Sequence, residues 1–421
     1  MQTTFSRSIP VVVQQHAEEA AHLRHLRSLL VGAQHVKLHH LRRLDDRIAA
    51  YLDGLAVAGE FGSELCDAAL ESPGTGEIFC VAVRALGERK ADRLDKALAL
   101  AAVLPEALRG VVSAFGWVSA TDLKGIVTGL LTSSDVFRQR VGIVACALHR
   151  VDPGPALDGV IESPEPALLA RALRCAGEVG RVDLLPVLVS AFKDRDPECR
   201  FRAAQSAVLL GDRHAAFVVL QQTALQSGPF RLSALALALF AAEALSASEL
   251  VNQVAGQRED VRLLIRSVGF AGDVKRIPWL IDLMSDDKLA RLAGESFSFI
   301  TGVDLAWLDL ERKPPEKFES GPNDNPEDED VSMDEDDGLP WPDQARVQAW
   351  WVANSHRFPL GTRYFIGAQP SWEHCLQVLK EGYQRQRIAA AHYLCLLQPG
   401  TPLFNCAAPS WRQKRLLERM S

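Results

Sequence analysis

The sequence lacks the short motifs that mark common enzyme sites. It contains no GxxxxGK[ST] phosphate loop, no GxSxG turn, no GxGxxG at a strand-to-helix turn, and no paired Cys and His residues at metal-ligand spacing. A catalytic triad that is assembled only in space would leave no such trace. The sequence therefore gives no support for an enzyme, and we expect no catalytic residue, no metal ligand and no cofactor.

Aromatic residues and long apolar runs are also scarce. Aromatic residues make up only 7% of the chain, whereas Ala and Leu are abundant. Because Ala and Leu favour helices and β-branched residues favour strands, this composition predicts an all-α protein. The apolar stretch LSALALALFAAEALSA is too short for a membrane span and contains Glu243. The N-terminal residues show no apolar core of a secretory signal, so we expect a soluble, cytoplasmic protein without membrane contacts.

The chain has eight cysteines but no CxxC pair. Most of them lie among Ala and Leu in stretches with helical spacing. A free cysteine in such surroundings behaves as a small apolar residue, and unpaired thiols persist in reducing compartments. We therefore interpret the cysteines as core residues of an intracellular protein.

The negative charge is concentrated in one segment. Residues 324–337 hold nine carboxylates and no Lys or Arg, whereas the whole chain has a net charge of -7. Removing these nine charges leaves the remainder near +2. A near-neutral body argues against direct nucleic-acid binding, which needs a basic stripe. The segment is either a solvated spacer or a polyanion that docks on a basic partner.

A helical unit recurs about every 31 residues through the middle of the chain. Each unit has an Ala/Leu-rich stretch, a turn and a second apolar stretch. Such a unit cannot bury its apolar face alone, so stacked neighbours complete the core of a solenoid. Six of the turns fall at a glycine and two fall at other residues. The positions are Gly87, Gly116, Gly180, Gly211, Gly272 and Gly302, with His149 and Ala242 as the two exceptions.

An arginine recurs in similar phase near the start of the first helices. It either lines an anion groove or packs its stem on the previous repeat and pairs with a neighbouring Asp, and we favour the second interpretation. The series comprises Arg138, Arg171, Arg202, Arg231, Arg262 and Arg291.

Composition predicts four segments. Residues 1–75 form a cap that contains a helical hairpin over 9–57, because apolar residues recur there at three- and four-residue steps. Residues 76–310 form the repeat array. Residues 311–340, rich in Pro, Gly and carboxylates, form an acidic, mobile linker. Residues 341–421 form a mainly helical C-terminal module.

Two polar clusters near the N-terminus have ordinary explanations. His35 and His39 are four residues apart, but no further ligand completes a metal site. Asp45 and Asp46 lie among arginines at helical spacing, which charge pairs on a helix explain.

The repeats resemble HEAT-like repeats over roughly residues 80–310. DLLPVLVSAFKDRDPECRFRAAQSAVLLGD has the Pro of the second helix, the acidic turn, the Arg and the closing Gly-Asp of that pattern. The opening IPVVVQQHAEEAAHLRHLRSLL and the closing LPWPDQARVQAWWVANSHRFPLGTRYFIGA are similar to a family of bacterial HEAT-repeat proteins of unassigned activity. That family tends to be encoded beside type VI secretion components, PAAR-tip proteins and toxic effectors.

The resemblance implies a HEAT-like α-solenoid that binds a protein of that secretion system. The chain is then an immunity protein that neutralises a cognate effector, and one version of this hypothesis has a nuclease as the partner, because the acidic run imitates nucleic acid. Alternatives are an adaptor that loads an effector or tip protein, and an enzyme or nucleic-acid-binding solenoid. The family supplies no catalytic residues.

Partner contacts are expected along a face made by the second helices and their flanking turns. A single aromatic there is expected to be a hot spot or to pack between repeats. The acidic run adds contacts if it acts as a polyanion. The nominated residues are Asp194, Arg195, Arg213, His214, Lys275, Arg276, Trp279, Glu327, Asp328, Glu329 and Asp330.

Overall fold

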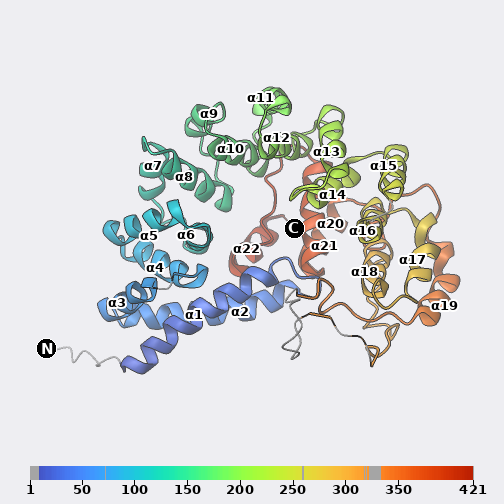
Figure 1. The fold of residues 1–421 in the computed structure, drawn as a ribbon, viewed down its shortest axis with the longest axis horizontal. Coiled ribbons are helices and arrows are strands. Elements are labelled where there is room, and N and C mark those ends of the chain that lie inside the picture. Colours follow the sequence, from blue (N-terminus) through green and yellow to red (C-terminus); the bar gives the residue numbers. More distant parts are fainter. Residues whose placement is uncertain are drawn as a thin grey trace. The chain divides into compact units, whose positions relative to one another are not determined.

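The computed structural model describes residues 9–71, 73–257, 260–316, 318, 320–321 and 333–420. These residues form 22 α-helices, five short 3-10 helices and no strand, which confirms the predicted all-α, HEAT-like solenoid (Figure 1). None of the described helices is both long and apolar enough to cross a membrane. The chain divides into two compact units. Unit 1 comprises Met1–Leu188, Lys380–Arg385 and Gly400–Ser421, and unit 2 comprises Val189–Leu379 and Gln386–Pro399.

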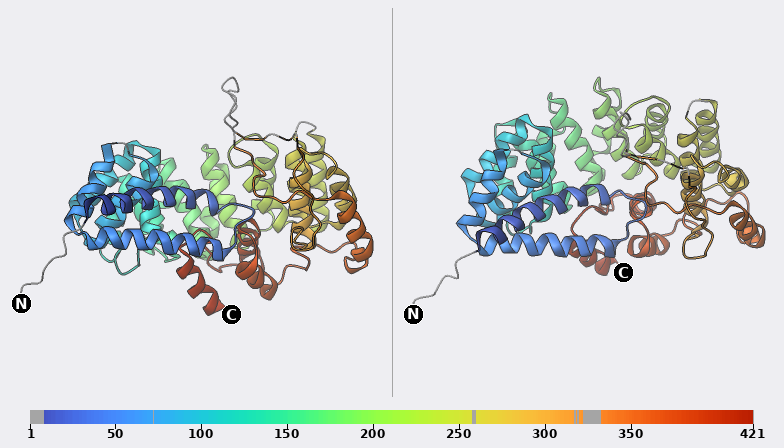
Figure 2. Two further views of the ribbon diagram at one scale, coloured as in Figure 1. Left: turned by 90° about the horizontal axis from the view of Figure 1, so that it is seen from below. Right: turned by 60° about the horizontal axis from the view of Figure 1, so that its bottom comes forward.

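Unit 1 begins with the predicted helical hairpin. Helix α1 (Pro10–Leu30) starts with Pro10 in its first turn, where the missing N–H removes no helical hydrogen bond. Helix α2 (Leu38–Val57) lies beside it in both views of Figure 2. Leu41 and Ile48 of the predicted apolar stripe are fully buried.

The remainder of unit 1 is built from helix pairs. The first helices α4, α6, α8 and α10 pack one on the next in chain order, so each covers the apolar face of its neighbour. The helices are α3 (Glu60–Ala68), α4 (Thr75–Glu88), α5 (Ala91–Val103), α6 (Pro105–Trp117), α7 (Ile126–Leu131), α8 (Val136–His149), α9 (Pro155–Val160), α10 (Pro166–Val179) and the C-terminal α22 (Ser410–Met420).

Unit 2 continues the same arrangement. Its first helices α12, α14, α16 and α18 stack in chain order, and α13, α15 and α17 pack against them. Helix α11 (Leu185–Ser190) contains the boundary between the units. The helices are α12 (Pro197–Leu209), α13 (Ala215–Leu225), α14 (Arg231–Ala241), α15 (Ala244–Gly256), α16 (Val261–Ala271), α17 (Ile277–Leu283), α18 (Ala290–Thr301), α19 (Gln344–Asn354), α20 (Trp372–Glu381) and α21 (Gln384–Leu397).

The predicted turns coincide with helix ends, and four of them use a left-handed glycine. The φ angles are 84° at Gly180, 113° at Gly211, 67° at Gly272 and 72° at Gly302. A Cβ atom on Gly180 would lie 2.2 Å from the backbone oxygen of Gly400, so this glycine also permits a close backbone approach.

At two predicted turns, the helix ends shortly after the glycine rather than at it. Gly87 and Gly116 lie inside α4 and α6 rather than beyond them. Helix α4 ends instead at Arg89, which adopts the left-handed conformation with φ 55°. Arg150, next to the predicted turn at His149, does the same with φ 57°.

The C-terminal residues contribute to both units. Residues 380–385 and 400–421 belong to unit 1, whereas residues 341–379 and 386–399 belong to unit 2. The predicted boundaries after residues 75, 310 and 340 do not coincide with this division. The segment GTRYFIGA (361–368) forms no strand, and two isolated bridges join Arg363 to Asp273 and Phe365 to Ala368.

Candidate functional site

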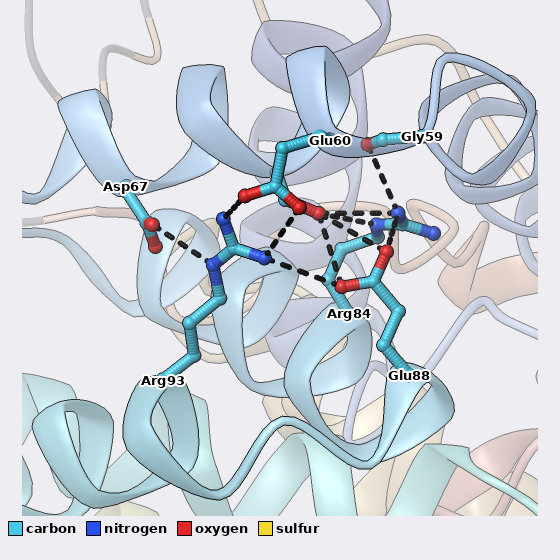
Figure 3. A network of polar contacts seen from close by, with 7 residues as sticks. Gly59, Glu60, Asp67, Arg84, Glu88 and Arg93 are labelled. Atoms are coloured by element: carbon cyan, nitrogen blue, oxygen red, sulfur yellow. Dashed lines mark hydrogen bonds and ion pairs between the residues drawn. The ribbon is translucent and has the colours of Figure 1, made fainter.

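A network of charged side chains ties together α3, α4 and α5 in unit 1 (Figure 3). Arg84, only 8% exposed, donates from Nη2 to the Gly59 oxygen at 3.3 Å and to Ser63 Oγ at 3.1 Å. The same nitrogen pairs with Glu88, one turn further along α4. Nε and Nη2 of Arg84 therefore both have acceptors, as buried guanidinium nitrogens require.

Arg93 extends the network from α5. It pairs with Glu60, with Asp67 at 3.0 Å and with Glu88 at 3.4 Å. The side-chain hydrogen bonds that Arg93 donates to Glu60, and then to Asp67, raise the pKa of Arg93 above its already high value. The network fixes α3 and α5 against α4. Its member Arg84 also lines an open groove.

This groove has a volume of about 700 Å³ and is lined only by unit 1. Helices α2 and α4 supply small and apolar side chains, including Ala49, Leu52 and Val83. The segment after α6 and helix α22 form the other walls. A volume of this size accommodates several side chains of a binding partner.

Two tryptophans form an aromatic edge of the groove. The Trp117 and Trp411 rings are 4.8 Å apart between centroids and nearly perpendicular, at 85°. Trp117 also packs edge-on against the buried Phe79, at 5.7 Å. Because these contacts fix the ring of Trp411, which is half-buried, the groove presents an aromatic surface that is already ordered.

Helix α22 adds positive charge to the same groove. Arg412, Arg415 and Arg419 follow one another at steps of three and four residues and all line it. Arg412 donates to the Gly116 oxygen at 2.8 Å and to the Val118 oxygen at 2.9 Å. Burial, and then the charge of Arg415, lowers the pKa of Arg412 to about 10. Arg415 and Arg419 are exposed and make no ion pair with any described residue.

The groove contains few groups suited to catalysis. His149 bonds through Nε2 to the Phe115 oxygen at 2.8 Å, and burial, followed by the charge of Arg412, lowers its pKa. Asp122 accepts a hydrogen bond from the Ser119 N–H at 3.2 Å. Within the described ranges, no cluster of three or more His, Cys, Asp or Glu side chains is placed to hold a metal. Aromatic rings beside free guanidinium groups are typical of recognition surfaces.

The seven nominated residues outside the acidic run all lie in unit 2. No described hydrogen bond or ion pair joins any two of them. Arg195, His214 and Lys275 are exposed, and Trp279 is half-buried on α17.

Three nominated residues have structural contacts instead. Arg213 donates to the Leu396 oxygen at 2.6 Å, and burial lowers its pKa. The Asp194 carboxylate accepts from the Asp196 N–H at 2.8 Å, which shapes the turn before α12. Arg276 donates to Asn252 at 2.6 Å.

Each recurrent arginine pairs with an acidic residue, which is an Asp, as we favoured, for four of them and a Glu for Arg171 and Arg202. Arg231 pairs with Asp260 at 2.9 Å, and Arg202 pairs with Glu198 at 3.2 Å while its guanidinium lies over Phe201 and Phe230. The other members also have acidic partners: Asp95 for Arg138, Glu178 for Arg171, Asp336 for Arg262 and Asp334 for Arg291.

The acidic run is not a free polyanion over its whole length. Asp334 pairs with Arg291 at 2.7 Å, and Glu335 pairs with Arg266 at 3.2 Å. Asp336 is 2% exposed and pairs with Arg262 at 2.6 Å. We expected a mobile linker, whereas this end of the segment makes ion pairs with α16 and α18. The nominated residues Glu327, Asp328, Glu329 and Asp330 lie outside the described residues.

The start of the predicted linker is also held in unit 2. Arg312 pairs with Asp287 at 2.6 Å and lies over the Trp341 ring at 5.3 Å. The backbone N–H of Arg312 donates to the Trp341 oxygen at 2.7 Å. Composition alone suggested mobility because it does not reveal Asp287 and Trp341, which hold Arg312 at this end, or the arginines of α16 and α18, which pair with the other end.

The N-terminal histidines act in helix capping and surface packing. His40 Nδ1 accepts a hydrogen bond from the Lys37 N–H at 3.1 Å, which caps the start of α2. The His39 and His40 rings are 4.0 Å apart, and both side chains are exposed.

The sequence analysis missed the contacts that the C-terminal segment makes with helix ends. In unit 1, the Leu403 N–H donates to the Glu178 oxygen at 3.0 Å, and Asn405 donates to the Leu148 oxygen at 3.1 Å. These oxygens belong to the last turns of α10 and α8, where carbonyl groups have no intrahelical partner. No local sequence signal identifies such long-range acceptors.

In unit 2, a late segment of the chain also donates hydrogen bonds to the ends of helices. Arg363 donates to the Phe240 oxygen at the end of α14, at 2.6 Å. The Tyr364 N–H donates to the Gly272 oxygen after α16, at 3.0 Å. A cation at a helix C-terminus also interacts favourably with the helix dipole.

Comparison with known proteins gives a match to one family model over part of the chain. Residues 155–240, which run from the start of α9 into α14, match the family model for HEAT repeats. No curated protein and no solved structure matches the chain. The match supports a HEAT-repeat family, and such repeats are typical of helical scaffolds that interact with proteins.

Proposed function

We propose that this chain is a non-enzymatic, cytoplasmic scaffold that binds one partner protein, and that the partner is a type VI secretion effector which the chain neutralises. The single observation that carries the binding role is the HEAT-repeat match at residues 155–240. The resemblance of the two ends of the chain to proteins encoded beside type VI components supports the choice of partner.

The groove of unit 1 supports a binding role independently of that resemblance. It combines the ordered ring of Trp411 with the exposed guanidinium groups of Arg415 and Arg419. Aromatic and arginine side chains dominate the binding energy of many protein interfaces. We propose that the partner places acidic and apolar side chains in this groove.

The nuclease version of the proposal loses part of its basis. It rested on nine carboxylates between residues 324 and 337 that would imitate nucleic acid. Asp334, Glu335 and Asp336 are paired with arginines of unit 2. The proposal therefore extends to any effector with an acidic recognition surface.

Co-expression with candidate effectors tests the proposal. Each effector is produced in cells with or without the full chain, and complexes are isolated and their masses measured. We expect a stoichiometric complex and protection from toxicity with one effector. A variant with Arg415→Glu and Arg419→Glu should bind at least tenfold more weakly, whereas Arg43→Glu, an exposed control on α2, should bind normally. Absence of any complex would contradict the binding role.

A competition assay separates neutralisation from loading. Deleting the gene in a strain that meets its own sister cells should cause self-intoxication if the chain is an immunity protein. Healthy cells that no longer attack competitors would instead identify the chain as an adaptor that loads an effector or PAAR-tip protein.

A further inference from the structure

Unit 1 has a second cavity, which shares the lining residue Trp117 with the groove described above. It has a volume of about 480 Å³ and is lined by α1, α6 and the segment before α22. Three arginines line it, namely Arg24, Arg27 and Arg109, and no Asp or Glu does. The charge balance of these arginines decides what the cavity can hold.

The charge of Arg27 is already compensated. Its guanidinium pairs with Asp45, which is fully buried, and donates to the Ala407 and Ala408 oxygens at 3.0 Å each. These contacts provide acceptors for the N–H groups of Arg27 and one carboxylate for its charge. Arg27 is therefore a structural residue of the cavity wall.

Arg24 has no acidic partner. Its Nε donates to Ser113 Oγ and its Nη1 donates to Ser28 Oγ at 3.0 Å, so both acceptors are neutral hydroxyl groups. No described residue accepts a hydrogen bond from Nη2. The guanidinium lies over the Phe79 ring at 5.4 Å, which fixes its plane.

The surroundings of Arg24 make its charge unfavourable. Burial, and then the neighbouring charge of Arg27, lowers the pKa of Arg24 to about 10, so the group is still charged at neutral pH. The charge of Asp45, which pairs with Arg27, offsets this lowering only in part, and a partly desolvated cation without an ion-pair partner of its own destabilises the fold. Arg109 adds a second positive charge at the exposed rim of the cavity and makes no ion pair with any described residue.

We propose that this cavity is an oxyanion-binding site, in which a carboxylate or phosphate group lies between Arg24 and Arg109. The free Nη2 of Arg24 and the five donors of Arg109 supply charge-assisted hydrogen bonds. Ser113 lines the same cavity, and its hydroxyl, which accepts from Arg24, keeps a hydrogen that it can donate to an anion. Val112 and Leu148 form apolar wall, which suits an anion that carries a short carbon chain. The group belongs either to a small molecule or to an acidic side chain of a protein.

Titration with two simple anions tests this site on the full chain. Inorganic phosphate and glutarate, a dicarboxylate that models an acidic side chain, are added at constant ionic strength, with chloride as the balancing ion. Isothermal calorimetry and the midpoint of thermal unfolding are measured. We expect saturable binding of at least one anion and a matching rise in the unfolding midpoint.

Two variants and a control assign the binding to the cavity. Arg109→Ala, at the exposed rim, should weaken binding about tenfold or more, because one charge-assisted pair is lost. Arg24→Met should abolish anion binding. Without added anion, the unfolding midpoint of this variant should be no more than slightly lower than that of the native chain. Arg43→Ala, an exposed arginine on α2, should bind as the native chain does.

The outcomes are distinct. Saturation with phosphate alone identifies a phosphate-bearing ligand, saturation with glutarate alone identifies a carboxylate, and saturation with both identifies a general oxyanion site. The absence of saturation with either anion would overturn the proposal. Equal affinity in the native chain and in Arg109→Ala would overturn it as well, even if Arg24→Met fails to fold.

Discussion

The buried ion pair between Arg27 and Asp45 offers a sharp test of how unit 1 is held together. Arg27 on α1 is 3% exposed and Asp45 on α2 is fully buried. The second oxygen of Asp45 accepts the backbone N–H of Ser410 at 2.7 Å, at the start of α22. Substituting Asp45→Asn keeps the shape but leaves the Arg27 charge without a partner inside the protein.

The expected loss follows from the burial of both groups. Breaking a buried pair by removing one partner destabilises a protein by about 3–5 kcal/mol, because the remaining charge is uncompensated. For a unit of about 200 residues, each kcal/mol shifts the unfolding midpoint by about 2–4 °C. We therefore expect Asp45→Asn to lower the midpoint by about 6–20 °C, with a lower urea midpoint in equilibrium unfolding.

The neighbouring Asp46 provides a matched control. It pairs with Arg42 at 3.7 Å on the surface of the same helix, and both side chains are 64% exposed. Exposed pairs of this kind contribute about 0.5 kcal/mol or less. Asp46→Asn should therefore leave the urea midpoint almost unchanged.

Equal effects of Asp45→Asn and Asp46→Asn would refute the reasoning. The double variant Arg27→Met with Asp45→Leu gives a second check, because it removes both charges and leaves neither unpaired. It should recover part of the stability that Asp45→Asn loses. The recovery should be incomplete, since the Ser410 N–H and the Ala407 oxygen lose their partners.

Three further predictions concern acid stability, a helix end and the thiols. Burial alone would raise the pKa of Glu178, but the charges of Arg171, Arg174 and Arg150 lower it well below its usual range. Because the unfolded chain binds this proton first, stability should be full above about pH 4.5 and should fall as the pH drops below it, and Glu178→Gln should flatten that part of a stability-versus-pH curve. Gly180→Ala should lower the unfolding midpoint by several degrees, since φ is 84° and the new Cβ would lie 2.2 Å from the Gly400 oxygen; an unchanged midpoint would show that the segment can move away. All eight cysteines are buried, and burial raises the pKa of Cys66 to about 11 and of Cys375 to about 12. Iodoacetamide at pH 8 should therefore label the native chain slowly and the urea-unfolded chain quickly by mass spectrometry, and rapid native labelling would contradict this burial.

Local patterns predicted the helices and their order. The stripe that includes Leu41 and Ile48 identified α2, because burial at three- and four-residue steps is a property of one helix. The recurring glycines located the ends of α10 and α16, because only glycine adopts the left-handed conformation without strain. These signals depend on neighbours in the sequence, so the sequence alone was sufficient.

The candidate sites depend on contacts between distant residues, and these left no local signal. Trp411 meets Trp117 across almost 300 positions, and Arg24 meets Ser113 across 89. Arg213 was nominated as a surface contact because it lies in a turn, but its guanidinium reaches the Leu396 oxygen of a much later helix. Whether an arginine in a turn is exposed or buried is decided by a segment that packs on it afterwards.

The acidic segment is a second case in which contacts between distant residues left no local signal in the sequence. Its composition predicted solvation, because carboxylates without nearby cations in the sequence cannot be buried. Arg262 and Arg291, at the starts of α16 and α18, supply the missing cations from about 40–70 residues away. Asp336 is therefore buried beside a cation that compensates its charge. A recurring arginine and a run of carboxylates in one sequence are thus better interpreted together than separately, since each is the simplest counter-ion for the other.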